Sequence, residues 1–220
     1  MSLRSRFVFL NSFQLKCIAM LTMLIDHIGA ICFPQIIWLR AIGRLSFPIF
    51  CFLIVEGFFY TRDIRCYMAR LGLFALLSEI PYDLAFYHTI WNPQKQNVFF
   101  SLFIGICILW VIERKDEWGY RIIEVLLAMW FAEIMHVDYG FRGILLIVWF
   151  YIMREKRWLK YAGAAAWNFI RGLTIQGYGA LSVFPIALYN GKRGPNIKYF
   201  FYMFYPVHLL VLYLIHSRIL

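Results

Sequence analysis

The chain has 220 residues, of which 62% are hydrophobic and only 15% charged, and its formal net charge is +10. Soluble domains are usually about 45–50% apolar and about 25% charged, and a globular fold of this length could not hide so much apolar surface from water. The composition therefore excludes an ordinary soluble domain and predicts a lipid-embedded protein, which also fits the 20% content of aromatic residues because Trp and Tyr collect at bilayer interfaces.

The positive charge does not indicate a nucleic-acid partner. The Lys and Arg residues lie between apolar runs, where membrane topology explains them, and the chain carries no RNA- or DNA-binding motif. Its five cysteines are scattered through apolar stretches without CxxC or zinc spacing, so we expect small packing residues and no metal site. The basic segment MSLRSRFVFLNSFQ lacks a small-residue cleavage site and is expected to be retained in the cytoplasm.

A transmembrane helix needs roughly 20 predominantly apolar residues, and the sequence contains nine apolar segments that are candidates. They span residues 13–33, 38–60, 66–87, 97–113, 120–136, 139–153, 158–175, 177–190 and 197–216. We therefore predict a single all-α domain over residues 1–220, a polytopic membrane bundle of about nine transmembrane helices. The segment at 177–190 is the weakest candidate because it contains Gly177, Gly179 and Pro185, and it could be re-entrant instead.

Basic residues recur in every second loop between these segments. Arg62 and Arg65 follow the second segment, and similar clusters follow the fourth, sixth and eighth, whereas the intervening loops are poor in Lys and Arg. Because positive charge favours the cytoplasmic side, this alternation puts the N-terminus in the cytoplasm and the C-terminus outside. We expect a multi-pass protein of the bacterial cytoplasmic membrane.

The first segment, LKCIAMLTMLIDHIGAICF, carries Lys16, Asp26 and His27 on an otherwise apolar helix. Lys16 and His27 are eleven residues apart, which is about three helical turns, so they share a face and lie about 16 Å apart along the axis. A groove along this face could hold a long, thin molecule with its anionic end at Lys16 and its reactive end at His27. The alternatives are a Lys16 that only snorkels to the interface and a structural His27.

Ionisable residues also lie on the second segment. Asp26 diverges from His27 by about 100° on the first helix, so it either orients the imidazole from a bent geometry or pairs with a cation on another helix. Arg44 is expected at the depth of His27 and Glu56 nearer the cytoplasm, with a kink at Pro48 between them. The alternative role for Arg44 is an ion pair that locks two helices.

The third segment adds two carboxylates. Glu79 and Asp83 are four residues apart and share a helix face, and we expect both in the outer half of the membrane, near the depth of Arg44 and His27. Either could neutralise Arg44, orient His27 or hold an amine acceptor. Asn97 stands at the start of the fourth segment, where it is expected to cap the helix or to contact a substrate.

Three more polar residues are expected at mid-depth or toward the outer side. Asp138 lies in the link MHVDYGFRG, Arg171 is near the outer end of the seventh segment, and His208 follows a proline in FYPVHLLVLYLI. A short acidic turn is the alternative for Asp138. With Asn97, these residues are our candidate substrate contacts.

Several stretches together resemble a known family: LTMLIDHIGA, IGRLSFPIFCFLIVEGFFYTR, SEIPYDLAF, QNVFFSLFIG and FYPVHLLVLYLI. They resemble the TraX family over nearly the whole chain, from about Leu15 to Ile215. That family is associated with acetylation of the N-terminus of conjugative pilin, and it is similar to the membrane-embedded acyltransferases that use acyl-CoA. A basic residue, ten intervening residues and a histidine mark the related acyltransferase-3 family, and Lys16 and His27 match that spacing.

The resemblance implies a transmembrane acyltransferase-like bundle that draws acetyl-CoA from the cytoplasm. Lys16, Arg62 and Arg65 would meet the anionic end of the CoA, with Glu56 beside them. The slender pantetheine arm would then rise along the first helix toward His27. The acceptor would arrive from the outer side, and a peptide or pilin N-terminus, a cell-surface sugar and an exported small molecule all fit. The oligomeric state is left open.

The same resemblance implies the catalytic set. His27 would be the general base that takes a proton from the acceptor, and Arg44 or a backbone N–H would stabilise the oxyanion. Asp26, Glu79 and Asp83 complete the set as groups that orient the base or hold the acceptor. A covalent acetyl-histidine is the alternative route.

Two other classes of function compete with this hypothesis. A small proton-coupled transporter would use Glu56, Glu79, Asp83 and His27 as proton-relay groups, although no inverted repeat is evident. A non-catalytic scaffold would use its buried charges only to lock helices together. Binding of acetyl-CoA separates the enzyme from both, because neither of the others needs it.

Overall fold

The computed structural model describes residues 8–114, 117–170 and 174–219, and the regular secondary structure in these ranges is helical. In chain order the elements are α1 (Ser12–Ile31), α2 (Ile37–Gly43), α3 (Ser46–Tyr60), α4 (Ile64–Tyr87), α5 (Val98–Ile112), α6 (Trp118–Ile134), α7 (Gly140–Ile152), α8 (Arg157–Trp167), the 3₁₀ helix η2 (Ile175–Ser182), α9 (Val183–Ala187) and α10 (Lys198–Ile219). The predicted all-α class is confirmed.

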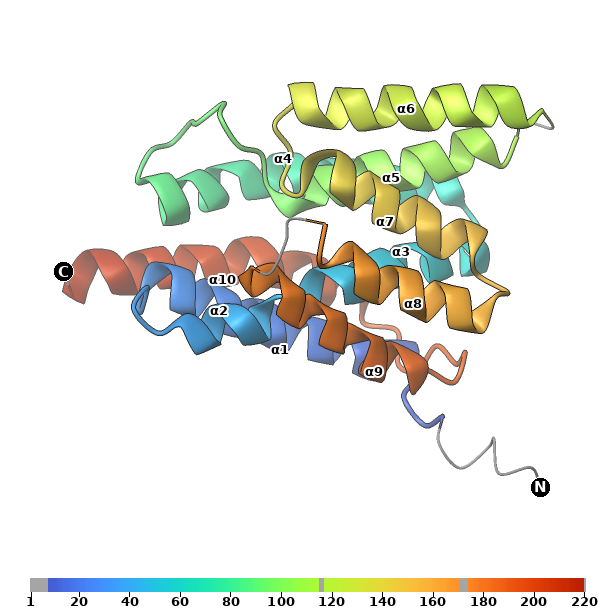
Figure 1. The fold of residues 1–220 in the computed structure, drawn as a ribbon. Coiled ribbons are helices and arrows are strands. Elements are labelled where there is room, and N and C mark those ends of the chain that lie inside the picture. Colours follow the sequence, from blue (N-terminus) through green and yellow to red (C-terminus); the bar gives the residue numbers. More distant parts are fainter. Residues whose placement is uncertain (1–7, 115–116, 171–173, 220) are drawn as a thin grey trace.

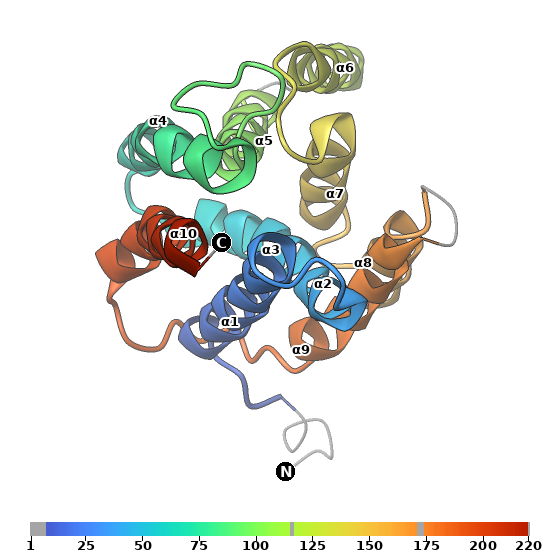
Figure 2. The same cartoon turned by 90° about the vertical axis from the view of Figure 1, so that its left-hand side faces the viewer.

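The helices pack around α3, which lies near the centre when the bundle is viewed from its end (Figure 2). Within Ser46–Val55, every residue except Phe50 is buried. On one side α1 packs against α2, α3 and α10, and on the other α7 packs against α3, α5, α6 and α8, while α4 joins α5 to α10. α6 lies at the rim of the bundle in both views (Figures 1 and 2). This arrangement brings the first and last helices of the chain side by side.

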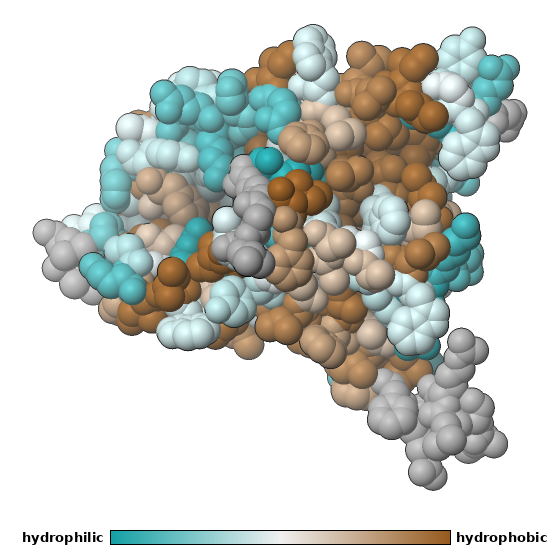
Figure 3. Space-filling view, in the orientation of Figure 1, coloured by the Kyte–Doolittle hydropathy of each residue, from teal (hydrophilic) through white to brown (hydrophobic). Residues whose placement is uncertain are grey.

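The surface is compatible with a lipid environment. Among the described helices, three are long and apolar enough to cross a membrane: Ser12–Ile31, Ile37–Tyr60 (α2 and α3 together) and Lys198–Arg218. Figure 3 shows hydrophobic surface across the middle of one face, between hydrophilic patches toward its two ends. Large apolar side chains such as Trp130 and Phe184 are 65% and 67% exposed. The predicted membrane character is supported, but the predicted number of nine spans is not confirmed.

The second predicted segment, 38–60, is interrupted shortly before Pro48, the position of the predicted kink. α2 ends at Gly43, and α3 begins at Ser46 after a turn at Arg44 and Leu45. Pro48 explains the position of the break, because its ring excludes the carbonyl four residues earlier and it has no N–H to donate to that carbonyl. That carbonyl belongs to Arg44.

The predicted segments at 158–175 and 177–190 are shorter in the structure. α8 ends at Trp167, and residues 177–190 form part of η2 followed by the short helix α9 rather than one continuous helix. Neither element approaches the roughly 20 residues that a spanning helix needs. Gly177 and Gly179 in η2 and Pro185 in α9 explain why residues 177–190 do not form one α-helix, since both residue types weaken an α-helix.

Capping interactions define where the helices begin. Asn11 and Gln14 form a reciprocal capping box at α1, with both hydrogen bonds at 2.9 Å, and Asn97 caps α5 as predicted, its side chain accepting from the N–H of Phe99. Asp63 caps α4 by accepting from the N–H of Cys66 at 3.0 Å. That hydrogen bond holds the pKa of the Asp63 carboxyl below its ordinary value, because it stabilises the ionised form.

Candidate functional site

A pair of buried histidines joins the first and last helices. His27 on α1 and His208 on α10 lie with Nδ1 of His27 2.7 Å from Nε2 of His208. Phe86 of α4 and Tyr205 of α10 pack edge-to-face on His27, with ring centroids 5.4 and 5.8 Å away. The aromatic surroundings fix the imidazole of His27 in one orientation.

The carboxylate next to His27 points to a different neighbour. Asp26 accepts from Arg40 Nη1 at 2.6 Å and from Arg44 Nη2 at 2.5 Å, so each of its oxygens holds one guanidinium. Arg40 also donates to the backbone carbonyl of Asp26 at 3.0 Å. Of the two predicted roles for Asp26, the structure has the pairing with cations on another helix.

This ion cluster depends on a close approach of α1 and α2. A Cβ added to Gly43 would lie 2.2 Å from the Cβ and Oδ1 of Asp26, closer than real atoms come. Gly43 therefore leaves the space that the Asp26 carboxylate occupies. The residue type at this position is a requirement of packing rather than of backbone conformation.

His27 and the ion cluster line one cavity of about 170 Å³, here called the histidine cavity. Its polar lining residues are Asp26, His27, Arg40, Arg44, Ser46, Tyr82, Tyr87, Lys95, Asp138, Tyr139 and Tyr205. A base, three cations, two carboxylates and several hydroxyl groups therefore share a small space among the helices. That combination suits proton transfer beside a developing negative charge.

A second cavity, of about 220 Å³, lies at the end of the bundle where α1 begins, and is here called the basic cavity. Its cationic lining residues are Lys16, Arg70, Arg193 and Lys198. Lys16 lies over the ring of Phe201, 5.3 Å from its centroid. Arg193 is brought there by backbone hydrogen bonds from Ser12 and Phe13 to the loop of Lys192 and Arg193.

The basic cavity and the histidine cavity are adjacent. Both are lined by Met23, Phe50, Val98 and Tyr205, here called the shared wall. Lys16 lies on one side of this wall and His27 on the other, both on α1. The predicted face of the first helix thus runs from one cavity to the next.

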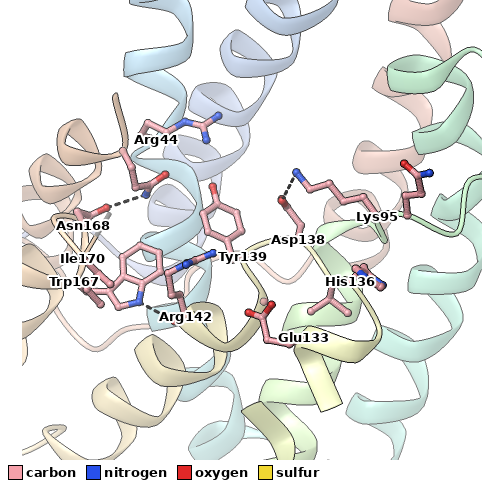
Figure 4. Close-up of a pocket in the computed structure, with 14 residues that line it drawn as sticks. Arg44, Lys95, Glu133, His136, Asp138, Tyr139, Arg142, Trp167, Asn168 and Ile170 are labelled. Carbon is pink, nitrogen blue, oxygen red and sulfur yellow. Dashed lines mark hydrogen bonds and ion pairs between the residues drawn. The ribbon is translucent and has the colours of Figure 1, made fainter. Parts of the chain in front are cut away.

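A third cavity, of about 280 Å³, opens on the far side of the histidine cavity and is here called the polar cavity (Figure 4). The two have Arg44, Lys95, Asp138 and Tyr139 in common. Lys95 and Asp138 point toward each other in Figure 4 and form an ion pair at 3.0 Å. The three cavities therefore follow one another through the bundle, with His27 in the middle one.

Comparison with known protein sequences shows which family this chain belongs to. The sequence profile described as TraX protein matches residues 12–216. The chain belongs to the TraX family. All residues that line the three cavities lie within the matched range.

Relatives of this TraX-family chain include a Dichelobacter nodosus protein named "Probable fimbrial assembly protein FimC, serogroup H1", which is 28% identical over 94% of the chain and 96% of the relative. Protein TraX of Escherichia coli is 25% identical over 60% of the chain. The alignment spans about half of that protein, 52% of its length. No solved structure matches the chain.

The predicted cofactor residues divide into two groups in this TraX-family structure. Lys16 and Glu56 line the basic cavity, and Glu56 lies 3.9 Å from Arg154. Arg62 and Arg65 are exposed and are not among the residues that line it. The cavity takes its other cations from α4, from the loop before α10 and from the first residue of α10.

The predicted carboxylates of α4 have other partners. Glu79 accepts from the side chain of Asn97, which also donates to the carbonyl of Ala75 at 2.8 Å. Asp83 accepts from the N–H of Asn92 at 2.8 Å. Glu79, Asp83 and Asn97 are buried and hold the start of α5 and the preceding loop, and none of them is among the residues lining the histidine cavity.

The predicted substrate contacts are dispersed. Asp138 lies between the histidine and polar cavities, where a substrate contact remains a prediction. His208 contacts His27 directly, and Asn97 caps α5. Arg171 lies outside the described residues.

Several site residues were missed by the sequence reasoning. Arg40 is four residues before Arg44, so helical spacing could have found it. Arg70 and Arg193 were explained only as topology charges or not considered, because no local pattern joins α4, the loop before α10 and Lys16. Tyr205 carries no polar signal that separates it from the many other aromatic residues.

Proposed function

We propose that this protein is an integral membrane acetyltransferase. It moves an acetyl group from cytoplasmic acetyl-CoA to an amine or hydroxyl acceptor that arrives from the outer side, with His27 as general base. The observation that carries this proposal is the order of the three cavities: a basic cavity, then a small cavity with a histidine, then a polar cavity. Donor and acceptor can approach the same base from opposite ends of the bundle.

The basic cavity suits the donor. CoA has an anionic nucleotide end and a slender pantetheine arm, and the cavity has four cations with largely apolar and aromatic walls. Nε of Arg70 is buried and has no hydrogen-bond partner among the described residues, so an anionic ligand would satisfy a donor that is otherwise costly to bury. Lys16, Arg70 and Arg193 would meet phosphates, and the arm would pass the shared wall.

The chemistry needs only groups that line the histidine cavity. Nε2 of His27 takes the proton of the acceptor N–H or O–H while that nitrogen or oxygen attacks the thioester carbonyl carbon. The carbonyl oxygen becomes an oxyanion, which Arg44 stabilises electrostatically. The C–S bond then breaks, and the proton on His27 passes to the leaving thiolate to give free CoA.

Asp26 supports this step indirectly. By holding Arg40 and Arg44 it keeps their charges beside the reacting carbonyl and offsets part of their desolvation cost. Lys16 and His27 match the acyltransferase-3 spacing of a basic residue and a histidine, and we propose a relationship to that family. Their positions on both sides of the shared wall give the spacing a physical reason.

The acceptor is proposed from the relatives and from the polar cavity. Membership of the TraX family, together with a relative named for fimbrial assembly, suggests the N-terminus of a pilin or of another peptide as the acceptor. A cell-surface sugar is the alternative. Glu133 and Asp138 line the polar cavity and could guide an ammonium group. We place this cavity on the outer side of the bacterial cytoplasmic membrane, with the N-terminus in the cytoplasm.

Release of free CoA from acetyl-CoA tests the proposal. Full-length wild-type protein and His27→Ala would be purified in detergent and assayed with a panel of peptide amines and sugars, with acetyl-CoA binding measured separately. We expect His27→Ala to bind acetyl-CoA normally and to lose turnover by about 10²- to 10⁴-fold, the usual contribution of a general base.

His216→Ala is the matched control, because His216 is a histidine of α10 that lines none of the three cavities. It should keep wild-type turnover. A wild-type protein that neither binds nor consumes acetyl-CoA with any acceptor would sink the proposal. Proton-linked flux in liposomes would then favour the transporter.

A further inference from the structure

His27 and His208 belong to a chain of hydrogen bonds that ends at a backbone carbonyl. Nδ1 of His27 lies 2.7 Å from Nε2 of His208, and Nδ1 of His208 lies 2.6 Å from the carbonyl oxygen of Phe204. The two imidazole planes differ by 5° and their centroids are 4.9 Å apart. The facing nitrogens therefore meet edge to edge, where an N–H points at its neighbour's lone pair.

The carbonyl fixes the positions of the protons. A carbonyl oxygen can only accept a hydrogen bond, so Nδ1 of His208 carries a proton and donates a hydrogen bond to the backbone carbonyl of Phe204. In a neutral imidazole the other nitrogen is then an acceptor, so Nε2 of His208 accepts from Nδ1–H of His27. By the same rule, Nε2 of His27 carries a lone pair and no proton.

This lone pair is available to the histidine cavity. Nε2 of His27 has no hydrogen-bond partner among the described residues, and it is not one of the atoms shut off from solvent. The other charged groups near it cannot take over the role of His208. Arg40, Arg44 and Lys95 are donors only. Both oxygens of Asp26 are engaged by the two arginines, and Asp138 is paired with Lys95 at 3.0 Å.

We propose that His208 is a positioning residue that holds His27 in the tautomer whose Nε2 can accept a proton. This inference rests on the proposed function, in which His27 is the general base. His208 fills the place that a carboxylate or a backbone carbonyl often has behind a catalytic histidine. It is itself held by Phe204 and Tyr205, with ring centroids 4.7 and 5.7 Å away.

The proton count closes without a further partner. When Nε2 of His27 takes the acceptor's proton, Nδ1–H stays directed at His208, and the proton on Nε2 later leaves with the thiolate. Phe204 only accepts a hydrogen bond and exchanges no proton. His208 thus ends each turnover in the tautomer in which it began.

Two amide substitutions separate the presence of an acceptor from its position. The amide oxygen of Gln can reach about the place of Nε2 of histidine, whereas that of Asn reaches only about the place of Nδ1. We expect His208→Gln to keep kcat within about tenfold of wild type, and His208→Asn and His208→Phe to lose about 10²-fold. The Kd for acetyl-CoA should be unchanged in all three. Equal losses in His208→Gln and His208→Asn would overturn the inference.

A second measurement does not depend on turnover. Full-length wild-type protein labelled with ¹⁵N-histidine would be studied by NMR, with the His27 signals assigned by their loss in His27→Ala. We expect a protonated Nδ1 and an unprotonated Nε2 on His27. A protonated Nε2 overturns the inference even if the enzyme is active. The expected tautomer in a protein that neither binds nor consumes acetyl-CoA would instead overturn the proposed function.

Discussion

At the scale of single residues, adjacent positions on α1 have separate tasks. Successive side chains on a helix diverge by about 100°, so Asp26 reaches Arg40 and Arg44 while His27 reaches His208. In the proposed mechanism, the acid holds the two arginines beside the reacting carbonyl, and the histidine is the base. A substitution of Asp26 should therefore lower both stability and activity, whereas a substitution of His27 should lower mainly activity.

Asp26→Asn tests this separation. The change leaves Arg40 and Arg44 without their counter-charge, and removing one partner of a buried ion pair typically costs about 3–5 kcal/mol. We expect a fall of about 3 kcal/mol in the free energy of unfolding, measured by denaturant titration in detergent, together with lost activity. His27→Ala should lose activity with a much smaller change in stability.

The comparison at an exposed carboxylate is Asp63→Asn, which retains a side-chain oxygen to cap α4 and should leave turnover near wild type. If Asp26→Asn is as stable as Asp63→Asn, the ion cluster is not what holds α2 against α1. The assignment of Asp26 to a charge-holding role would then be wrong.

At the scale of elements, the contact between α1 and α2 is set by a glycine. Gly43→Ala puts a methyl group where the Asp26 carboxylate lies, and overpacking of this kind usually costs about 1–3 kcal/mol. We expect this variant to have a lower Tm, measured by thermal unfolding, and a lower kcat, measured by the CoA-release assay.

Gly119→Ala is the matched control for this prediction. A Cβ at Gly119, in the first turn of α6, would meet nothing within 4 Å, and alanine has a higher helix propensity than glycine. This variant should be as stable as wild type or slightly more stable. Equal behaviour of the two variants would contradict the tight α1–α2 contact.

Much of the element list could be predicted from apolar periodicity. The segments 13–33, 66–87 and 197–216 correspond closely to α1, α4 and α10, because long apolar runs have few alternatives to a helix in lipid. Residues 177–190, the weakest of the predicted segments, are not one continuous helix, because the backbone preferences of Gly177 and Pro185 outweigh hydrophobicity there. Length of an apolar run alone does not separate a spanning helix from a short buried one.

The site was less predictable than the helices. The face shared by Lys16 and His27 follows from helical spacing within one element, and the structure has both residues lining adjacent cavities. His208 is 181 residues from His27, and no sequence pattern states which helices pack together. Glu79 and Asp83 had the right residue type and spacing but face α5 and the loop before it.

At the scale of the whole molecule, charge and cavity are arranged along one direction. Cations surround the basic cavity at one end of the bundle, His27 is in the middle, and mixed charges line the polar cavity at the other end. In the proposed function, this order would let the bundle bring together two reactants that never share a compartment. The structure also separates two sets of arginines that the sequence alone could not distinguish.

Arg70→Gln and Arg193→Gln should each raise the KM for acetyl-CoA by about tenfold. Each variant loses a charge-assisted contact to the donor, which is worth roughly 1.5–3 kcal/mol when buried and less where solvent screens it. Arg62→Gln and Arg65→Gln should leave this KM near wild type, since their side chains are exposed outside the cavity lining. Steady-state kinetics at two salt concentrations measures all four. The reverse pattern would restore the cofactor site predicted from the sequence.

A bacterial membrane stores energy as a voltage and a proton gradient, and a water-filled path across the lipid would discharge both. If the three cavities follow one another across the bilayer, then the shared wall of Met23, Phe50, Val98 and Tyr205 is what keeps ions and protons from crossing the membrane through this protein. A thin donor arm that parts these side chains also fills the gap it makes. In the proposed reaction, the wall would therefore block a leak between turnovers, and the substrate would block it during them.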